Sequence, residues 1–314
     1  MPLNVAVQMD PMEKVKIAGD SSFALMLSAQ ARGHAIWHYD VDALSYTTEG
    51  TLKTRARPVT VQRVEGDHFS FGDWETLDLR GDIDVVLMRQ DPPFDLSYIT
   101  ATHLLERIQP DTLVVNDPAA VRNAPEKIFV LDFAEFMPPT LITRSLDDVR
   151  AFQRQHGDIV VKPLYGNAGS AVFKIGPDDG NLPALAELFG DVWVEPYMVQ
   201  AFLPDVSQGD KRIVLVDGEA AGGVNRLPKK GEIRSNFAVG GSGAQSELTP
   251  RELEICEALG PELKKRGLIF VGIDVIGGYL TEINVTSPTG IVSIDNFNGT
   301  DTVGMIWDAI ESKL

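Results

Sequence analysis

The stretch FVGIDVIGGYLTEINVTSPTG, residues 270–290, carries polar side chains with the spacing of a metal site. Glu282 and Asn284 lie two apart on a predicted strand, so both side chains share one face and can reach one metal ion. Oxygen ligands of this kind suit Mg²⁺ held against phosphate groups. The alternative is a solvent-facing hairpin, but the flanking apolar residues Leu280 and Ile283 leave one face polar, which favours the metal site.

Asp274 lies on the preceding predicted strand, and the hairpin turn decides whether it joins that site. A two-residue turn over 277–278 places Asp274 opposite Thr281 and away from Glu282, whereas a three-residue turn over 277–279 places it opposite Glu282. We predict the three-residue turn and therefore three metal ligands, Asp274, Glu282 and Asn284. Asp274 and Glu282 on opposite faces would remove Asp274 from the site.

A second candidate site for chemistry is KPLYGNAGSAVF, where Lys162 ends a predicted strand and a glycine-bearing turn follows. Backbone N–H groups of such a turn can approach phosphate oxygens, with lysine supplying a charge beside them. The pattern is not a Walker P-loop, and a strand–turn–strand hairpin is also common ordinary structure. Lys127, in NAPEKIFV, is a second candidate cation, although a lone lysine is usually a surface residue.

The third segment is LPKKGEIRSNFAVGGSG, residues 227–243, which is rich in glycine and charge. Long loops of this composition are either functional or disordered. Arg226 beside it and Arg234 and Asn236 within it favour a lid that closes over phosphates and excludes water. A plain surface loop is the alternative.

Composition excludes several other classes of site. The formal charge of −17 argues against binding nucleic acid or anionic membranes. The single Cys256 excludes an intrachain disulfide and a cysteine-based zinc cluster, and its helical apolar neighbours place it in the core. The five histidines form no HxH or HExxH pair. Without an apparent signal peptide or membrane-spanning run, we expect a cytoplasmic protein.

The elements that must position these residues follow an α/β pattern, with short apolar runs alternating with amphipathic helices. Residues 1–121 predict an open parallel sheet covered by helices, 122–201 a smaller α+β unit, and 202–314 an antiparallel sheet with the lid and one strong helix. Ligands of open parallel sheets bind at the carboxyl ends of the strands. Asp20, Arg89 and Asp91 fall at those ends.

The three candidate segments occur in the same order as in the ATP-grasp superfamily. The sequence motifs around them resemble, more narrowly, those of the bacterial glutathione synthetases. The matching motifs cover nearly the whole chain and include DSSFALML, LMRQDPPFD, NAPEKIF, VVKPLYGNAG, FLPDVSQGDKRI and LTEINVTSPTG. MRQDPPFD and LTEINVTSPTG are specific to that family within the superfamily. The resemblance implies an ATP-grasp fold with an N-terminal substrate-binding domain, residues 1–121, a small lid subdomain, 122–201, and a catalytic subdomain, 202–314.

The likeness also implies roles for individual residues. The nucleotide would be bound by Lys127, Lys162, Gly166, Asn167, Gly169, Ser170, Gln200, Ala201, Phe202, Leu203 and Asp210. Arg212, Arg226, Arg234 and Asn236 would act on the transferring phosphoryl group. The peptide substrates would meet Asp20, Ser21, Arg89, Asp91, Ser287 and Thr289.

For the family, the reaction joins γ-glutamylcysteine and glycine with ATP and Mg²⁺ (or Mn²⁺) through an acyl phosphate, and the enzyme is a homo-oligomer, either dimer or tetramer. Such chemistry needs no enzyme nucleophile. The sequence departs from the family pattern at Ala168, Ser235 and Ser242, which affects loop dynamics rather than reaction class. Two alternatives remain: a D-Ala–D-Ala-like or amino-acid-adding ligase, and a non-catalytic synapsin-like ATP-binding module.

Overall fold

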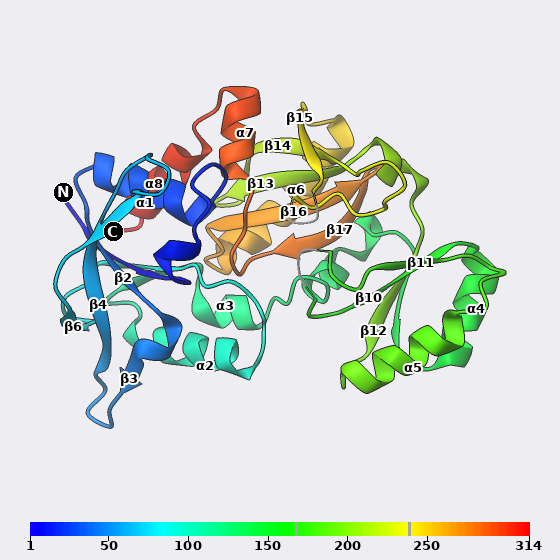
Figure 1. Ribbon diagram of the computed structural model, residues 1–314, viewed down its shortest axis with the longest axis horizontal. Coiled ribbons are helices and arrows are strands. Elements are labelled where there is room, and N and C mark those ends of the chain that lie inside the picture. The colour runs from blue at the N-terminus through cyan, green and yellow to red at the C-terminus, as the bar shows by residue number, and fades with distance from the viewer. Residues whose placement is uncertain (167–168, 238–239) are drawn as a thin grey trace.

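The computed structural model describes residues 1–166, 169–237 and 240–314. Three β-sheets follow one another along the longest axis of the molecule (Figure 1). The N-terminal sheet lies at one end, a five-stranded sheet in the middle and a four-stranded sheet at the other end. Helices cover the sheets, so the α/β class predicted from the sequence is confirmed.

The N-terminal sheet is only partly parallel. It comprises β1 (Asn4–Gln8), β2 (Ala35–Tyr39), β3 (Leu44–Tyr46), β4 (Leu52–Val61), β5 (Phe69–Phe71), β6 (Glu75–Asp78), β7 (Val85–Met88) and β8 (Leu113–Val115). Strands β2, β1, β7 and β8 are parallel neighbours, as predicted. Strand β4 pairs antiparallel with β2 and carries β3, β5 and β6, an extension that the irregular sequence between 40 and 80 did not reveal.

Helices from both ends of the chain pack together on this part. They are α1 (Ser21–Ala31), α2 (Leu96–Leu105), α3 (Pro118–Arg122), α7 (Ile291–Asn298) and α8 (Thr302–Glu311). The carboxylate of Asp20 caps α1 by accepting from Phe23 N at 2.7 Å. Trp307 Nε1 of α8 donates to Leu25 O at 2.9 Å, so the C-terminal helix lies beside α1 (Figure 1).

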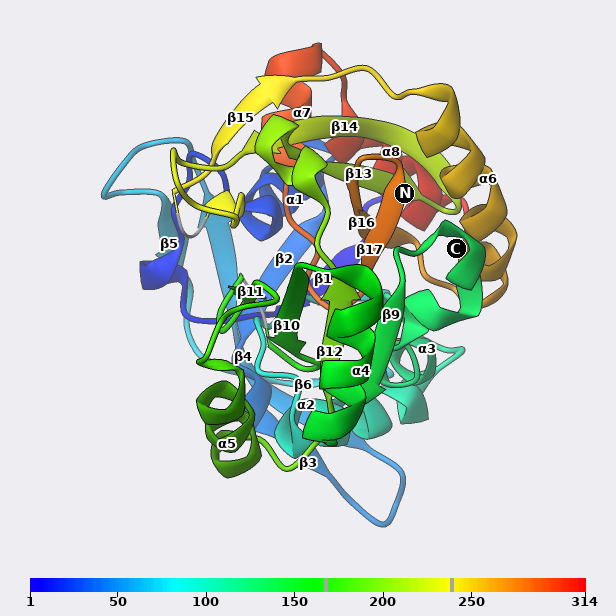
Figure 2. The same ribbon diagram turned by 90° about the vertical axis from the view of Figure 1, so that its right-hand side faces the viewer.

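The four-stranded sheet forms the small lobe that faces the viewer in Figure 2. Its elements are β9 (Thr140–Thr143), α4 (Leu146–His156), β10 (Ile159–Pro163), β11 (Phe173–Ile175), α5 (Leu182–Val192) and β12 (Tyr197–Ala201). The antiparallel order is β11-β10-β12-β9. Val149 of α4 and Phe189 of α5 pack against Val161 of β10, because their apolar faces recur at helical spacing.

The five-stranded sheet is antiparallel, in the order β15-β14-β13-β16-β17. Its elements are β13 (Asp210–Val216), β14 (Glu219–Leu227), β15 (Ser242–Gln245), α6 (Pro250–Lys265), β16 (Phe270–Ile276) and β17 (Tyr279–Asn284). A capping box opens α6, with Thr249 and Glu252 bonded reciprocally. Burial raises the pKa of the Cys256 thiol to about 12, which agrees with a core residue rather than a nucleophile.

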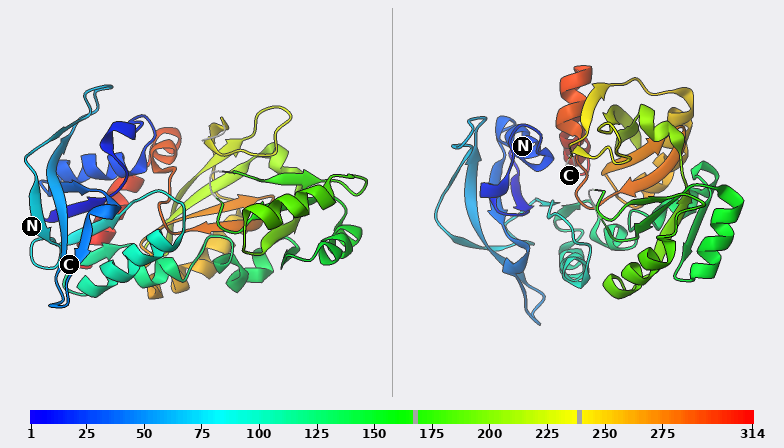
Figure 3. Two further views of the ribbon diagram at one scale, coloured as in Figure 1. Left: turned by 60° about the horizontal axis from the view of Figure 1, so that its bottom comes forward. Right: turned by 45° about the vertical axis from the view of Figure 1, so that its right-hand side comes forward.

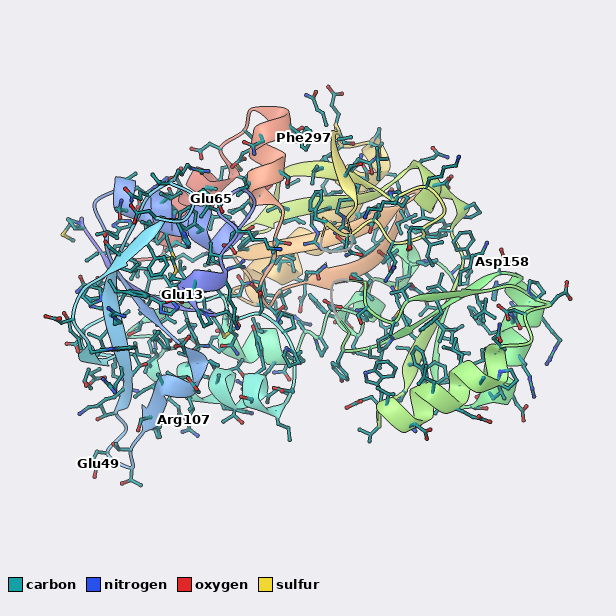
Figure 4. All side chains as sticks on the ribbon, viewed as in Figure 1. Glu13, Glu49, Glu65, Arg107, Asp158 and Phe297 are labelled. Atoms are coloured by element: carbon teal, nitrogen blue, oxygen red, sulfur yellow. The ribbon has the colours of Figure 1, made fainter. Side chains whose placement is uncertain are left out.

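Side chains fill the spaces between these layers (Figure 4). Phe297 of α7 contacts β15 so closely that a Cβ added to Gly243 would lie 2.6 Å from its ring. The two antiparallel sheets lie side by side in Figure 3. Among the helices in the described ranges, none is both long and apolar enough to cross a membrane.

Candidate active site

A cavity of about 470 Å³ lies where the three sheets approach one another. One wall comes from β10, β12 and the turn after β10, and the opposite wall from β13, β14, β16 and β17. Asp91 and residues 286–289 close the end nearest the N-terminal sheet. Among the described lining residues none is a histidine or a cysteine, in line with the sequence analysis.

The β16–β17 hairpin has the predicted pairing but not the predicted turn. Asp274 lies opposite Glu282, so that part of the prediction is confirmed. The turn, however, is the two-residue 277–278, and the three-residue prediction is wrong. A β-bulge restores the register, because Thr281 is the extra residue of β17 and its Oγ1 donates to Asp274 O at 3.1 Å.

Two arginines and two aspartates form what we call the guanidinium cluster: Arg212, Arg226, Asp210 and Asp274. Arg212 donates to both oxygens of Asp274, with Nε–Oδ1 at 2.6 Å and Nη2–Oδ2 at 3.1 Å. Arg226 Nη2 lies 2.7 Å from Asp210 Oδ2 and 2.9 Å from Asp274 Oδ1. All four side chains are buried.

The charges in this cluster decide which carboxylate is held ionised. Burial by itself would raise the pKa of Asp274, but Arg212 and Arg226 outweigh it and hold the pKa well below its usual range. Burial raises the pKa of Asp210, and Arg226 offsets this only in part. Asp274 is therefore the firmly ionised member, clamped between two guanidinium groups.

Two lysines and two glutamates form the ammonium cluster: Lys127, Lys162, Glu126 and Glu282. Glu282 Oε1 lies 3.5 Å from Lys127 Nζ and 3.4 Å from Lys162 Nζ. Lys127 also donates to Gly166 O at 2.8 Å and contacts the carboxylate of Glu126. The pKa of Glu282 is lowered, because the two lysines outweigh its burial.

Glu126 is a member of the site that the sequence analysis missed. Burial raises the pKa of Glu126 to about 7, although Lys127 opposes the shift. Its backbone O also accepts from Ile283 N at 3.1 Å, which ties this segment to β17. A carboxylate directly before the candidate Lys127 was the available signal, but adjacency in an irregular segment does not tell where a side chain points.

Of the three predicted metal ligands, Asp274 is already engaged by arginine, whereas Glu282 and Asn284 point into the cavity. Glu282 and Asn284 project from the same face of β17 into the cavity, and Asn284 Nδ2 is buried with no partner among the described residues. Both oxygens of Asp274 are engaged by arginine. Within the described ranges, no group of three histidine, cysteine or acidic residues is arranged to hold a metal.

Most of the predicted nucleotide residues lie along one wall of the cavity, and Asp210 lies on the opposite wall. Those that line it are Lys127, Lys162, Gly166, Gly169, Ser170, Gln200, Ala201, Phe202, Leu203 and Asp210. Asn167 and Ala168 fall outside the described residues. The N–H groups of Ala201 and Phe202 already donate to Pro139 O at 3.0 Å and Asp158 O at 2.9 Å, so a base at 200–203 must use other backbone groups.

The loop after β14 contacts the turn after β10. A Cβ added to Gly169 would lie 2.6 Å from Asn236 Oδ1 and 3.6 Å from Arg234 Cδ, and all three residues line the cavity. Arg234 forms an ion pair with Glu232 of the same loop, with Nη2–Oε2 at 3.1 Å. The structure therefore places Arg234 and Asn236 at the cavity, as the sequence analysis predicted, although Arg234 forms its ion pair with Glu232 of the same loop.

The predicted substrate residues divide into two groups. Asp91, Ser287 and Thr289 line the cavity, whereas Asp20, Ser21 and Arg89 are not among its described lining residues. Arg89 is buried and donates to Ser22 Oγ at 3.0 Å and to Pro288 O at 2.8 Å. In this structure Arg89 therefore supports the lining residue Pro288, and Asp20 serves as the α1 cap.

Comparison with known proteins agrees over the full length of the chain. Family models for the prokaryotic glutathione synthetase N-terminal domain and ATP-grasp domain match residues 3–122 and 126–299. A glutathione synthetase from Rhodopseudomonas palustris is 57% identical over 313 residues, covering 100% of this chain and 99% of that protein.

Solved structures show the same fold at low identity. A D-cycloserine synthetase is 14% identical with a TM-score of 0.70, covering 99% of this chain and 100% of its own. An ATP-grasp ligase solved with Mg and ADP is 18% identical with a TM-score of 0.61, covering 100% and 99%. At these identities the likeness concerns the fold alone. The ATP-grasp fold expected from the sequence is shown by the family model over residues 126–299.

Proposed function

The chain belongs to the prokaryotic glutathione synthetase family, and on that premise we propose that this cavity joins the cysteinyl carboxylate of γ-glutamylcysteine to the amine of glycine. ATP is the co-substrate of this ADP-forming ligase, and an acyl phosphate is the intermediate. The convergence of four buried cations, Lys127, Lys162, Arg212 and Arg226, on one cavity carries the proposal. Phosphoryl transfer depends mainly on positioning and charge neutralisation, which such a cavity supplies.

We assign the ammonium cluster to the nucleotide phosphates. Lys127 and Lys162 lie beside the 166–170 turn, and anionic phosphate oxygens would replace Glu282 as their partner. The guanidinium cluster would meet the transferring phosphoryl group, with Arg212 and Arg226 as donors. Arg234 and Asn236 would approach from the loop after releasing their local contacts.

For the metal, Glu282 and Asn284 fit Mg²⁺, because they offer carboxylate and amide oxygens from one strand face. Mn²⁺ prefers similar ligands. The bound ion would neutralise phosphate charge. Asp274 would join as a ligand only after giving up part of its pairing with Arg212 or Arg226.

The two ends of the cavity would take the remaining parts of the substrates. The adenine would lie at Gln200, Ala201, Phe202 and Leu203, with the ribose near Asp210, whose Oδ1 is buried and has no partner among the described residues. Asp91, Ser287 and Thr289 would contact γ-glutamylcysteine, while Asp20, Ser21 and Arg89 would shape that wall from behind.

Further expectations come from the sequence pattern, the net charge and the family. These are the domains 1–121, 122–201 and 202–314, a homo-oligomer of two or four chains, a cytoplasmic location, and no nucleic-acid or membrane partner. Size-exclusion chromatography with light scattering would test the oligomer.

One assay tests the function. The purified protein is supplied with ATP, MgCl₂, γ-glutamylcysteine and glycine, and both ADP and tripeptide are measured. We expect equal amounts of ADP and glutathione. ADP formed only with a different acid and amine would indicate another ATP-grasp ligase, and no ADP with any pair would indicate a binding module.

A further inference from the structure

In the described part of the loop between β14 and β15, a serine hydroxyl group is hydrogen-bonded to the cavity wall. In its described part, residues 228–237, the side-chain hydrogen bond that leaves the loop runs from Ser235 Oγ to Asp210 Oδ2, at 2.9 Å. The contacts of Arg234 with Glu232, and of Glu232 N with Lys229 O, stay within the loop. Removing the Ser235 hydroxyl would therefore release this described part of the loop from β13.

The buried position of Ser235 favours this hydrogen bond to Asp210. Its residue exposure is 2%, although Lys229 and Lys230 in the same loop are exposed. The next residue, Asn236, lies against Gly169 across the cavity opening. A hydrogen bond to a buried carboxylate at this point fixes the part of the loop that meets the opposite wall.

The acceptor connects the loop to the reacting end of the cavity. Asp210 Oδ2 receives both the Ser235 hydroxyl and Arg226, whose Nη2 lies 2.7 Å away. The same Nη2 lies 2.9 Å from Asp274. One carboxylate therefore sets the position of the loop relative to the arginine assigned to the phosphoryl group.

We propose that Ser235 is a positioning residue that latches the loop to Asp210 and so keeps water away from the acyl phosphate. The inference rests on the proposed function, because it requires that intermediate. Without the latch, water adds to the acyl carbon, the bond from that carbon to the phosphate oxygen breaks, and the carboxylate is regenerated. Phosphate and a proton are released, and the net reaction is hydrolysis of ATP to ADP and phosphate.

The test compares Ser235→Ala with Ser235→Thr, which keeps the hydroxyl, and with Ser242→Ala, the same chemical change at an exposed position on β15. The measured quantity is ADP formed per glutathione formed. We expect the small fraction of ADP that the wild type forms without glutathione to rise about tenfold in Ser235→Ala, the effect of one hydrogen bond to a charged acceptor. Ser242→Ala and Ser235→Thr should stay close to one to one.

A second measurement does not depend on turnover. Trypsin cleavage after Lys229, Lys230 or Arg234 in the substrate-free protein should be about tenfold faster in Ser235→Ala than in Ser242→Ala. Equal ADP-to-glutathione ratios and equal cleavage rates would overturn the latch. Uncoupling in both Ser235 variants would assign the effect to packing and also overturn it. A wild-type protein that makes no glutathione would instead refute the proposed function.

Discussion

The guanidinium and ammonium clusters line the same cavity but are built in different ways. Arg212 and Asp274 face each other across β13 and β16, and Asp210 and Arg226 across β13 and β14, so the register of one sheet creates both pairs. The ammonium cluster instead gathers side chains from the 126–127 segment, from β10 and from β17. It exists only because two separate sheets pack together.

The distances differ accordingly. The guanidinium contacts lie between 2.6 and 3.1 Å, whereas Glu282 lies 3.4 and 3.5 Å from the two lysines and its side chain is 20% exposed. Close, buried pairs are costly to break, while looser pairs can exchange partners when an anion arrives. The comparison indicates a rigid guanidinium cluster and more adaptable contacts between Glu282 and the two lysines, which fits the proposed roles in phosphoryl transfer and nucleotide binding.

The strongest way to break the guanidinium cluster is Arg226→Ala. It leaves Asp210 and Asp274 without one partner, which costs about 3–5 kcal/mol of stability for a buried pair. Turnover should fall by roughly 10²–10³ as well. Urea unfolding and kcat measure the two effects. An unchanged urea midpoint would show that this cluster is no more rigid than the ammonium cluster.

Lys162→Ala tests the ammonium cluster. Burial lowers the pKa of Lys162, and Glu282 keeps Lys127 as a partner when Lys162 is removed, so little stability should be lost. The kcat/KM for ATP should fall by about 10–100-fold, the loss of a charge-assisted contact. Lys265→Ala, which removes an exposed ion pair with Glu262 on α6 away from the cavity, is the control. A loss of stability as large as that of Arg226→Ala would contradict the comparison.

Glu126→Gln tests the ammonium cluster through the pH dependence of the free energy of unfolding. The folded pKa of Glu126 is raised to about 7, above the ordinary value of 4.5, so the protonated form favours folding. That contribution is complete below pH 4.5 and is lost as pH rises through 7, by up to about 3 kcal/mol. Unfolding of both proteins at pH 5 and pH 8 should show the wild type losing stability relative to Glu126→Gln. Parallel curves would refute the shift.

The smallest effect is expected for Thr281→Val, which removes the hydroxyl that closes the β-bulge. The loss of its bond to Asp274 O should cost about 1 kcal/mol of stability and a few-fold in kcat. Thr281→Ser keeps the hydroxyl and should behave like the wild type in both assays. If both variants behaved alike, the register would not depend on that hydrogen bond.

Local features were predicted well because the signals are local. The burial of Cys256 and the shared strand face of Glu282 and Asn284 each follow from residues a few positions apart. The antiparallel extension around β4 and the place of Glu126 at the cavity were not predicted, and neither was the contact of Arg89 with Pro288 O. Each of these depends on residues far apart in the chain.

The sequence by itself determined the α/β class, the family, and the alternation that puts Glu282 and Asn284 on one strand face. Only the tertiary structure decided the partners: which arginines clamp Asp274, which lysines hold Glu282, and how a bulge rather than a longer turn sets the register. The physical reason is the distance along the chain over which each interaction acts. Side-chain alternation and helix capping act within a few residues, whereas a salt bridge between β13 and β16 or between β10 and β17 depends on how distant segments pack.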